Sequence, residues 1–225
     1  MPVADGGPYP LALYSHGSSS QRFVASGNAE LLASHGFVVA APERIGIYGH
    51  SFGGYTALMA ASEEGGGRDE RIVAVVAQAP ATGLISDEGL ESITIPTLLL
   101  SGTRDRTTPV AQNTERPWEL ISGRPLIRVD IIDGGHQSFT DVCDYQALAP
   151  ELPDAPAVLV AFIEEFAVEG CAPLLIDIEV AHEIIDTYTL AFLQRYVAGD
   201  TEAEAYLTPE YAETIPEITY EAKLD

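Results

Sequence analysis

Hydrophobic residues in the first two thirds of the chain fall into short continuous runs, separated by segments with helical spacing. The runs cover residues 11–15, 37–41, 44–48, 72–77, 97–101 and 126–132. Continuous apolar runs of this length are typical of strands buried on both faces, whereas half-exposed strands alternate. Strands that alternate with helices indicate a parallel sheet. The pattern therefore predicts an α/β fold, with a mainly parallel sheet of about six strands flanked by helices.

The pattern changes after Cys143, where helical segments replace the apolar runs. The segments with helical spacing along the whole chain are residues 23–35, 52–61, 110–121, 155–168 and 181–197. We expect an α/β core over residues 1–172 and a helical extension over residues 173–225 that packs on it. From Thr201 the residues show no strong period, which predicts a short helix followed by a loosely held tail.

The chain is strongly acidic, with a formal net charge of −23 at pH 7. A polyanion repels phosphates and anionic lipid surfaces, so we expect neither nucleic acid nor a membrane surface as a partner. No stretch approaches the eighteen or so apolar residues that are needed to cross a bilayer. The first residues have neither the basic start nor the apolar run of a signal peptide.

A motif for a nucleophile lies between the third apolar run and the helix that follows it. Residues 49–53 read Gly-His-Ser-Phe-Gly and match G-x-S-x-G. Between a strand and a helix, this motif forms a sharp turn that exposes the serine hydroxyl at the end of the sheet. A pattern this short also occurs by chance, but its position at a strand-to-helix junction favours the functional interpretation. We predict that Ser51 is a nucleophile.

An acid and a base follow Ser51 at the ends of later strands. Asp105 comes just after the fifth apolar run, and His136 follows the sixth through two glycines. Active sites of parallel sheets gather at these strand ends, so we expect the three side chains to meet there. Asp133 is a competing acid, but it lies too close to His136 along the chain to orient it easily. We predict a triad of Ser51, Asp105 and His136.

A serine triad of this kind carries out acyl transfer, in which the carbonyl oxygen of the substrate becomes negatively charged. This oxyanion needs N–H donors to stabilise it. We expect them at the main chain of Phe52, directly after the nucleophile, and of Ser18, in the loop after the first strand. That loop could also be an ordinary polar turn. Arg104 and Arg106 flank the predicted acid, and they either help to keep it ionised or face solvent. The sequence contains no H-E-x-x-H motif and no Cys/His cluster, so we expect neither a metal nor another cofactor.

The two cysteines, Cys143 and Cys171, allow two interpretations. They are either free thiols of a chain kept in a reducing compartment or a disulfide formed in an oxidising one. The count alone favours neither.

Several motifs that fall in order along the chain resemble one group of proteins. They lie in residues 10–17, 33–42, 44–54, 101–106 and 135–143. With these segments, roughly residues 8–170 resemble bacterial α/β-hydrolases related to platelet-activating-factor acetylhydrolase and dienelactone hydrolase, a neighbourhood that includes cutinases and polyester hydrolases. The resemblance implies an α/β-hydrolase fold and a triad in the chain order Ser, Asp, His. It also implies hydrolysis of short-chain or small esters through an acyl-enzyme, without a cofactor.

The resemblance bears on compartment and substrate as well. Members of this group are often exported, which favours a disulfide between Cys143 and Cys171 and a secreted or periplasmic protein. Dienelactone hydrolases use a cysteine nucleophile, so the serine at position 51 argues against that activity. Polyester hydrolases tend to carry an aromatic residue after the fourth strand, where residues 78–82 have none. A polymeric ester is therefore an alternative that the sequence does not favour.

The sequence departs from this group between the second and third apolar runs. Only residues 42–44 connect them, and at about 3.5 Å per residue they span about 10 Å. Two parallel strands need a crossover of about a dozen residues. Three explanations remain: residues have been lost from the chain, the strand at this point is rearranged, or a second subunit supplies the missing part by domain swapping. We favour a compact or shortened chain over domain swapping. The short link also leaves a second hypothesis, a hydrolase-like binding protein without activity.

Overall fold

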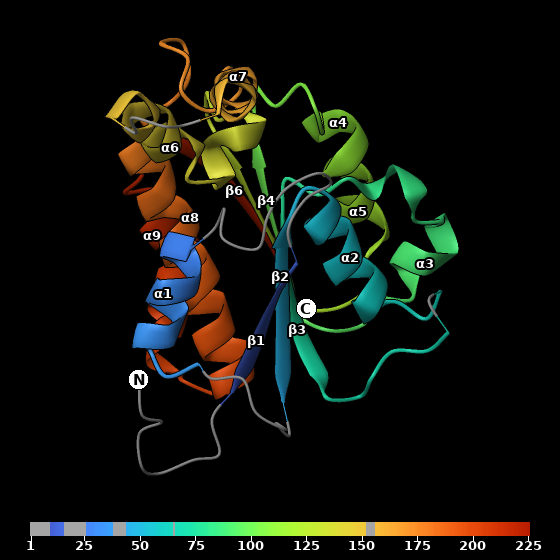
Figure 1. Ribbon diagram of the computed structural model, residues 1–225. Helices are drawn as coiled ribbons and strands as arrows, with labels where there is room; N and C mark the ends of the chain where they lie inside the picture. The colour runs from blue at the N-terminus through green and yellow to red at the C-terminus, as the bar shows by residue number, and fades with distance from the viewer. Residues whose placement is uncertain (1–9, 16–25, 38–43, 65, 152–155) are drawn as a thin grey trace.

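A six-stranded sheet forms the centre of the described molecule (Figure 1). The computed structural model describes residues 10–15, 26–37, 44–64, 66–151 and 156–225. The strands lie side by side in chain order; the first five are parallel, and the sixth is antiparallel to its neighbour. Their bounds are β1 Leu11–Ser15, β2 Ile45–His50, β3 Ile72–Gln78, β4 Thr97–Gly102, β5 Leu126–Ile131 and β6 Ile218–Lys223.

The mainly parallel α/β architecture is as the apolar runs predict, but one strand differs. Five of the six runs form β1 to β5. The run at 37–41 and the short link after it fall almost entirely on residues 38–43, which lie outside the described residues. The sixth strand of the sheet is β6, from the segment expected to be a loosely held tail, so that expectation is wrong.

The strands have continuous apolar runs because helices cover both faces of the sheet. In β3, Val76 faces one buried cluster and Val75 faces the other. In β4, Leu98 and Leu100 face the first cluster and Leu99 the second. Alternate side chains of a strand point to opposite faces, so a strand covered on both faces needs apolar residues throughout.

Two groups of helices make these layers (Figure 1). Helices α1, α8 and α9 lie on one side of the sheet and contribute to the first cluster, whereas α2, α3 and α5 lie on the other side. The helix bounds are α1 Ser26–Ser34, α2 Phe52–Ala61, α3 Asp87–Glu91, α4 Val110–Asn113, α5 Glu115–Leu120, α6 Val142–Leu148, α7 Ala157–Ala167, α8 Ile178–Leu193 and α9 Pro209–Ala212. No helix within the described ranges is both long and apolar enough to span a membrane.

The C-terminal strand is held by side chains on both of its faces. Ile218 is buried in the first cluster, with Tyr220 and Ala222 packed against it. On the other face Glu221 lies opposite Arg128 of β5, and the two are ion-paired at 3.4 Å. This alternation of apolar and polar residues is typical of a strand, and it contradicts the loosely held tail expected here. The boundary predicted at residue 172 remains a prediction; α8 and β6 both pack into the core of the sheet.

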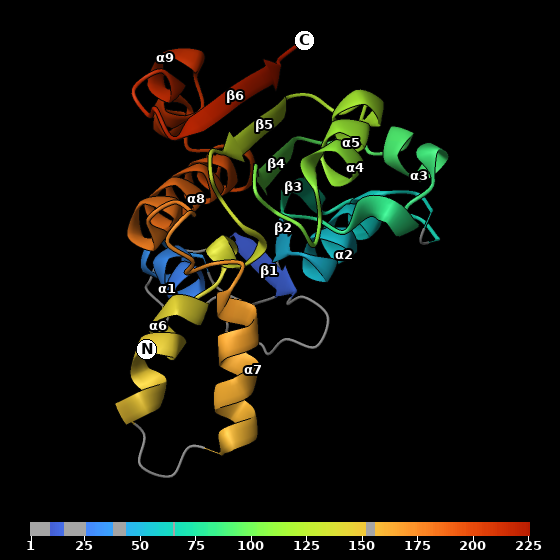
Figure 2. The same ribbon diagram turned by 90° about the horizontal axis from the view of Figure 1, so that it is seen from above.

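Helices α6 and α7 pack against each other and project from the rest of the molecule (Figure 2). They follow β5 and its loop, at the edge of the sheet where the parallel strands end. That edge carries the residues expected to be catalytic.

Candidate active site

Ser51 occupies a strained turn between β2 and α2. Its φ of 59° lies in the left-handed region, which L-residues other than glycine rarely adopt. The turn is held by the Ser51 N–H, which donates to the Gln78 carbonyl at 2.9 Å, and by the Ser51 carbonyl, which accepts from the N–H of Ala81 at 3.1 Å. A Cβ at Gly54 would lie 2.9 Å from Pro80, so glycine is required where the helix passes the chain after β3. The hydroxyl is therefore presented at the end of the sheet.

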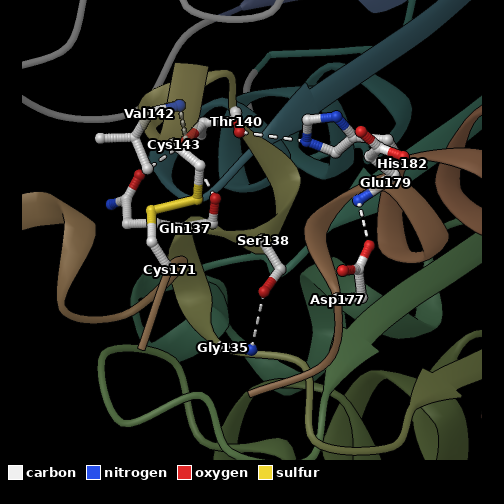
Figure 3. The surroundings of a disulfide bond; sticks show 10 residues. All are labelled: Gly135, Gln137, Ser138, Thr140, Val142, Cys143, Cys171, Asp177, Glu179 and His182. Atoms are coloured by element: carbon white, nitrogen blue, oxygen red, sulfur yellow. Dashed lines mark hydrogen bonds between the residues drawn. A yellow bond between two sulfur atoms is a disulfide. The ribbon is translucent and has the colours of Figure 1, made fainter. Parts of the chain in front are cut away.

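His136 lies within hydrogen-bonding distance of this hydroxyl. Its Nε2 is 2.9 Å from Ser51 Oγ, although 85 residues separate them in sequence. His136 begins a 3₁₀ turn, His136–Phe139, and is buried. The turn is closed by Ser138, whose Oγ accepts from the Gly135 N–H at 3.0 Å (Figure 3).

Asp105 accepts a hydrogen bond from the other ring nitrogen of His136. Its Oδ2 lies 2.7 Å from His136 Nδ1. A carboxylate only accepts hydrogen bonds, so Nδ1 carries the proton and Nε2 presents its lone pair to Ser51. The structure thus brings the three predicted residues together in one hydrogen-bonded series.

The Asp105 carboxylate is buried and has four hydrogen-bonding contacts. Oδ1 accepts from the N–H groups of Thr107 at 2.8 Å and Thr108 at 2.6 Å. Oδ2 accepts from the Thr108 hydroxyl at 2.7 Å and from His136. Burial by itself would raise the pKa of Asp105, but His136 and the Thr108 donors outweigh it and hold the pKa below its ordinary value. The carboxylate is therefore ionised at neutral pH.

The two flanking arginines do not contact this carboxylate. Arg104 is ion-paired with Asp133, and Arg106 lies 3.7 Å from Glu169. The idea that these arginines keep Asp105 ionised is therefore wrong; the contacts that lower the pKa of Asp105 are those with His136 and Thr108. Asp133, the competing acid, is half-exposed and bonded away from the histidine.

The loops that carry Asp105 and His136 are packed main chain against main chain. The Arg104 N–H donates to the Gly134 carbonyl at 2.9 Å. A Cβ at Gly102 would lie 2.3 Å from that same carbonyl oxygen, so no larger residue fits there without displacing the loop. This close approach sets the distance between acid and histidine.

One predicted oxyanion donor can be placed. Phe52 is the first residue of α2, and the first N–H groups of a helix have no acceptor within the helix. The Phe52 N–H is thus available beside the nucleophile. Ser18, the second predicted donor, lies outside the described residues.

His50, the residue before Ser51 in the Gly-His-Ser-Phe-Gly motif, is a further buried histidine at the site. Its Nε2 donates to the main-chain carbonyl of His136 at 2.9 Å, and the two ring centroids are 4.6 Å apart. The ring of Phe139 is stacked on the His50 ring, with ring centroids 5.8 Å apart. Burial, assisted by the charge of His136, lowers the pKa of His50 to about 3, so it stays neutral. The sequence signal for this residue is its position directly before the serine of G-x-S-x-G.

Cys143 and Cys171 form a disulfide close to the histidine loop (Figure 3). Residues 169–171 lie against that loop, because the Glu169 carbonyl accepts from the Gln137 N–H at 2.9 Å. A Cβ at Gly135 would lie 2.2 Å from the same carbonyl. The disulfide therefore ties α6 to the segment that supports the His136 turn.

Candidate ligands for a metal ion do not cluster in the described part of the chain. No group of three or more His, Cys, Asp and Glu side chains there could hold one.

Two family models match parts of the chain. Residues 1–45 match platelet-activating factor acetylhydrolase, isoform II, and residues 27–96 match the prolyl oligopeptidase family. No curated protein matches significantly. Both matched families are serine hydrolases that share one superfamily fold, and the second match includes β2, the Ser51 turn, α2 and β3.

Proposed function

We propose that this chain, a member of the α/β-hydrolase superfamily, hydrolyses short-chain or small carboxylic esters through an acyl-enzyme at Ser51. The observation that carries the proposal is the hydrogen-bonded series from Ser51 Oγ to His136 to Asp105, with contacts of 2.9 and 2.7 Å. This arrangement contains the nucleophile, the base and the group that orients the base.

In the acylation step, Ser51 Oγ attacks the ester carbonyl while His136 Nε2 accepts the hydroxyl proton. The carbonyl oxygen gains negative charge and accepts a hydrogen bond from the Phe52 N–H. When the intermediate collapses, the bond to the alcohol breaks and His136 returns the proton to the leaving oxygen. Asp105 stabilises the imidazolium that exists between these two transfers.

In the deacylation step, water takes the place of the alcohol. His136 removes a proton from the water, whose oxygen attacks the acyl carbonyl. Collapse of the second intermediate releases the carboxylic acid, and the proton returns to Ser51 Oγ. His50, which stays neutral, adds no second positive charge next to the imidazolium.

The charge of the chain favours neutral substrates. A net charge of −23 repels anions, and Arg104 and Arg106 beside the site are already paired with acids. The side chain of Phe52 is 40% exposed and packs on Tyr55, with ring centroids 4.8 Å apart, so an apolar surface lies next to the nucleophile. We therefore expect neutral esters with apolar acyl groups to be the best substrates.

The test combines covalent labelling with turnover. The wild type should react with a fluorophosphonate at Ser51, located by mass spectrometry of the digest, and should hydrolyse p-nitrophenyl esters of graded acyl length. Ser51→Ala should lose both activities, whereas Ser122→Ala, in the loop before β5, should keep them. A folded wild type that is neither labelled nor active would support the inactive binding protein instead.

Peptide hydrolysis is the second candidate, favoured by the match to the prolyl oligopeptidase family. The same three residues cleave an amide if His136 protonates the leaving nitrogen. Assays on p-nitroanilides and the matching p-nitrophenyl esters separate the two activities. A kcat/KM for the anilide equal to that for the ester would favour a peptidase.

We also propose that the protein works in an oxidising compartment, secreted or periplasmic. The pairing of Cys143 with Cys171 supports this, since such bonds persist mainly outside the cytosol. Titration of thiols in the denatured, unreduced protein purified from its native host should find none. Two free thiols would contradict the proposal.

A further inference from the structure

The hydroxyl of Thr108 lies where segments from three neighbouring strands meet. Its Oγ1 is 2.7 Å from Asp105 Oδ2 and 3.1 Å from His136 Nδ1. It is also 3.1 Å from the carbonyl oxygen of Ala79, the residue after β3. Thr108 itself is buried, with 4% of its surface exposed.

We propose that Thr108 is a positioning residue, whose hydroxyl fixes Oδ2 of Asp105 against Nδ1 of His136. This inference rests on the proposed hydrolysis at Ser51, because it concerns the residues that activate that serine. A threonine hydroxyl has a single proton, and we assign it to Oδ2, which is both the nearest acceptor and the charged one. The hydroxyl oxygen then faces the Nδ1–H group as a second, weaker acceptor.

The Thr108 hydroxyl completes a set of hydrogen bonds to both oxygens of the Asp105 carboxylate. On one side, the N–H groups of Thr107 and Thr108 hold Oδ1. On the other side, the Thr108 hydroxyl and the imidazole are the hydrogen-bonding partners of Oδ2 within the described part of the chain. Without the hydroxyl, the histidine alone would define the position of Oδ2, and the carboxylate could turn about its bond to Cβ. The imidazole would then be held less firmly towards Ser51.

Ala79 limits where the hydroxyl can lie. Its φ of 41° is in the left-handed region, and its N–H donates to the Leu100 carbonyl at 2.7 Å. Ala79 is 1% exposed, so its main chain is fixed between the ends of β3 and β4. Its carbonyl is thus a rigid neighbour of Thr108 Oγ1, contributed by a strand that carries none of the three triad residues.

The Thr108 hydroxyl also partly neutralises the negative charge of Asp105 next to the His136 imidazole. A donor removed from Oδ2 leaves the carboxylate charge less neutralised, so it attracts a proton on His136 more strongly. Among the described residues, His50 is a further titratable neighbour of His136, and it stays neutral. Arg104 and Arg106 are ion-paired with Asp133 and Glu169. Loss of the hydroxyl should therefore move the acid limb of the kcat/KM profile to higher pH.

The test replaces the hydroxyl without changing the shape of the side chain. Thr108→Val should lower kcat about tenfold, as expected for a lost hydrogen bond to a charged group, with KM changed less than about twofold. The rate of fluorophosphonate labelling at Ser51 should fall by the same factor, and the acid limb should move upward. Thr108→Ser, which restores the hydroxyl, should recover kcat to within about threefold of wild type.

Thr97→Val is the matched control. Thr97 is a fully buried threonine at the opposite end of β4, and its hydroxyl donates to the Ile95 carbonyl at 3.0 Å. Thr97→Val should leave kcat and the acid limb of the kcat/KM profile unchanged. If Thr108→Val does not fold, Thr108→Ala removes the same hydroxyl with a smaller side chain and should show the same losses.

The outcomes separate this inference from the proposed function. If the wild type neither hydrolyses esters nor reacts with the fluorophosphonate, the proposed function is wrong, and the role of Thr108 with it. If the wild type is active but Thr108→Val matches Thr97→Val in kcat, labelling rate and acid limb, only the role of Thr108 is wrong. A merely structural threonine would change stability and none of these three quantities.

Discussion

His50 donates its Nε2 proton to the main-chain carbonyl of His136 at 2.9 Å, so the residue before the nucleophile holds the loop of the base. The contact joins the end of β2 to the turn after β5. The imidazole is buried, and burial lowers the pKa of His50 to about 3 from an ordinary value of 6.5, although the hydrogen bond to the carbonyl by itself raises this pKa.

The burial of His50 predicts a loss of stability in acid. Between pH 6.5 and about 3 the unfolded chain binds a proton at His50 that the folded chain does not, so the free energy of unfolding falls as the pH falls. His50→Gln keeps an N–H donor without titrating and should flatten this slope. Urea unfolding between pH 4 and 7 measures it. His35→Gln, at an exposed histidine, is the control; equal slopes for His50→Gln and wild type would show that His50 is not buried neutral.

Asp105 should be far more important for turnover than the nearby Asp133. Asp105→Asn removes an acceptor from Nδ1 and favours the wrong tautomer of His136, so kcat should fall by about 10⁴-fold. Asp133→Asn, at a half-exposed acid paired with Arg104, should change kcat less than about twofold. Steady-state kinetics on one p-nitrophenyl ester compares them. A larger loss for Asp133→Asn would reverse the assignment of the acid.

Gly102 should not tolerate a side chain, although it lies outside the triad. Its Cβ would lie 2.3 Å from the Gly134 carbonyl oxygen, which would push apart the loops that carry Asp105 and His136. We expect Gly102→Ala to lower the free energy of unfolding by about 3 kcal/mol and to lower kcat as well. Gly83→Ala, where no atom lies within 4 Å of the new Cβ, should change stability by less than about 0.5 kcal/mol. Denaturant titration would contradict the prediction if the two variants were equally stable.

The disulfide should contribute measurably to stability. Cys143 and Cys171 are 28 residues apart, and closing a loop of that length in the unfolded chain is worth about 3.5 kcal/mol. Reduction should lower the free energy of unfolding by that amount. The double variant Cys143→Ser with Cys171→Ser should match the reduced wild type and not respond to reductant. A wild type whose stability is the same with and without reductant would rule out this contribution.

The layered architecture and the three candidate residues could be predicted from the amino-acid sequence alone. Continuous apolar runs require strands covered on both faces, and Ser51, Asp105 and His136 each follow such a run. Because parallel strands place their carboxyl ends at one edge, order along the chain was enough to predict that these side chains meet.

The surroundings of these three residues depend on the three-dimensional fold. Thr108, Ala79 and His50 come from three different strand ends. Thr108 contacts Asp105 and His136, Ala79 contacts Thr108, and His50 contacts His136, and the sequence does not show that these segments meet. Arg104 and Arg106 flank Asp105 in sequence, yet their partners are Asp133 and Glu169. β6 alternates as strands do, but it was placed only by pairing with β5, nearly ninety residues away. Such contacts depend on which segments the fold brings together, and a local pattern does not contain that information.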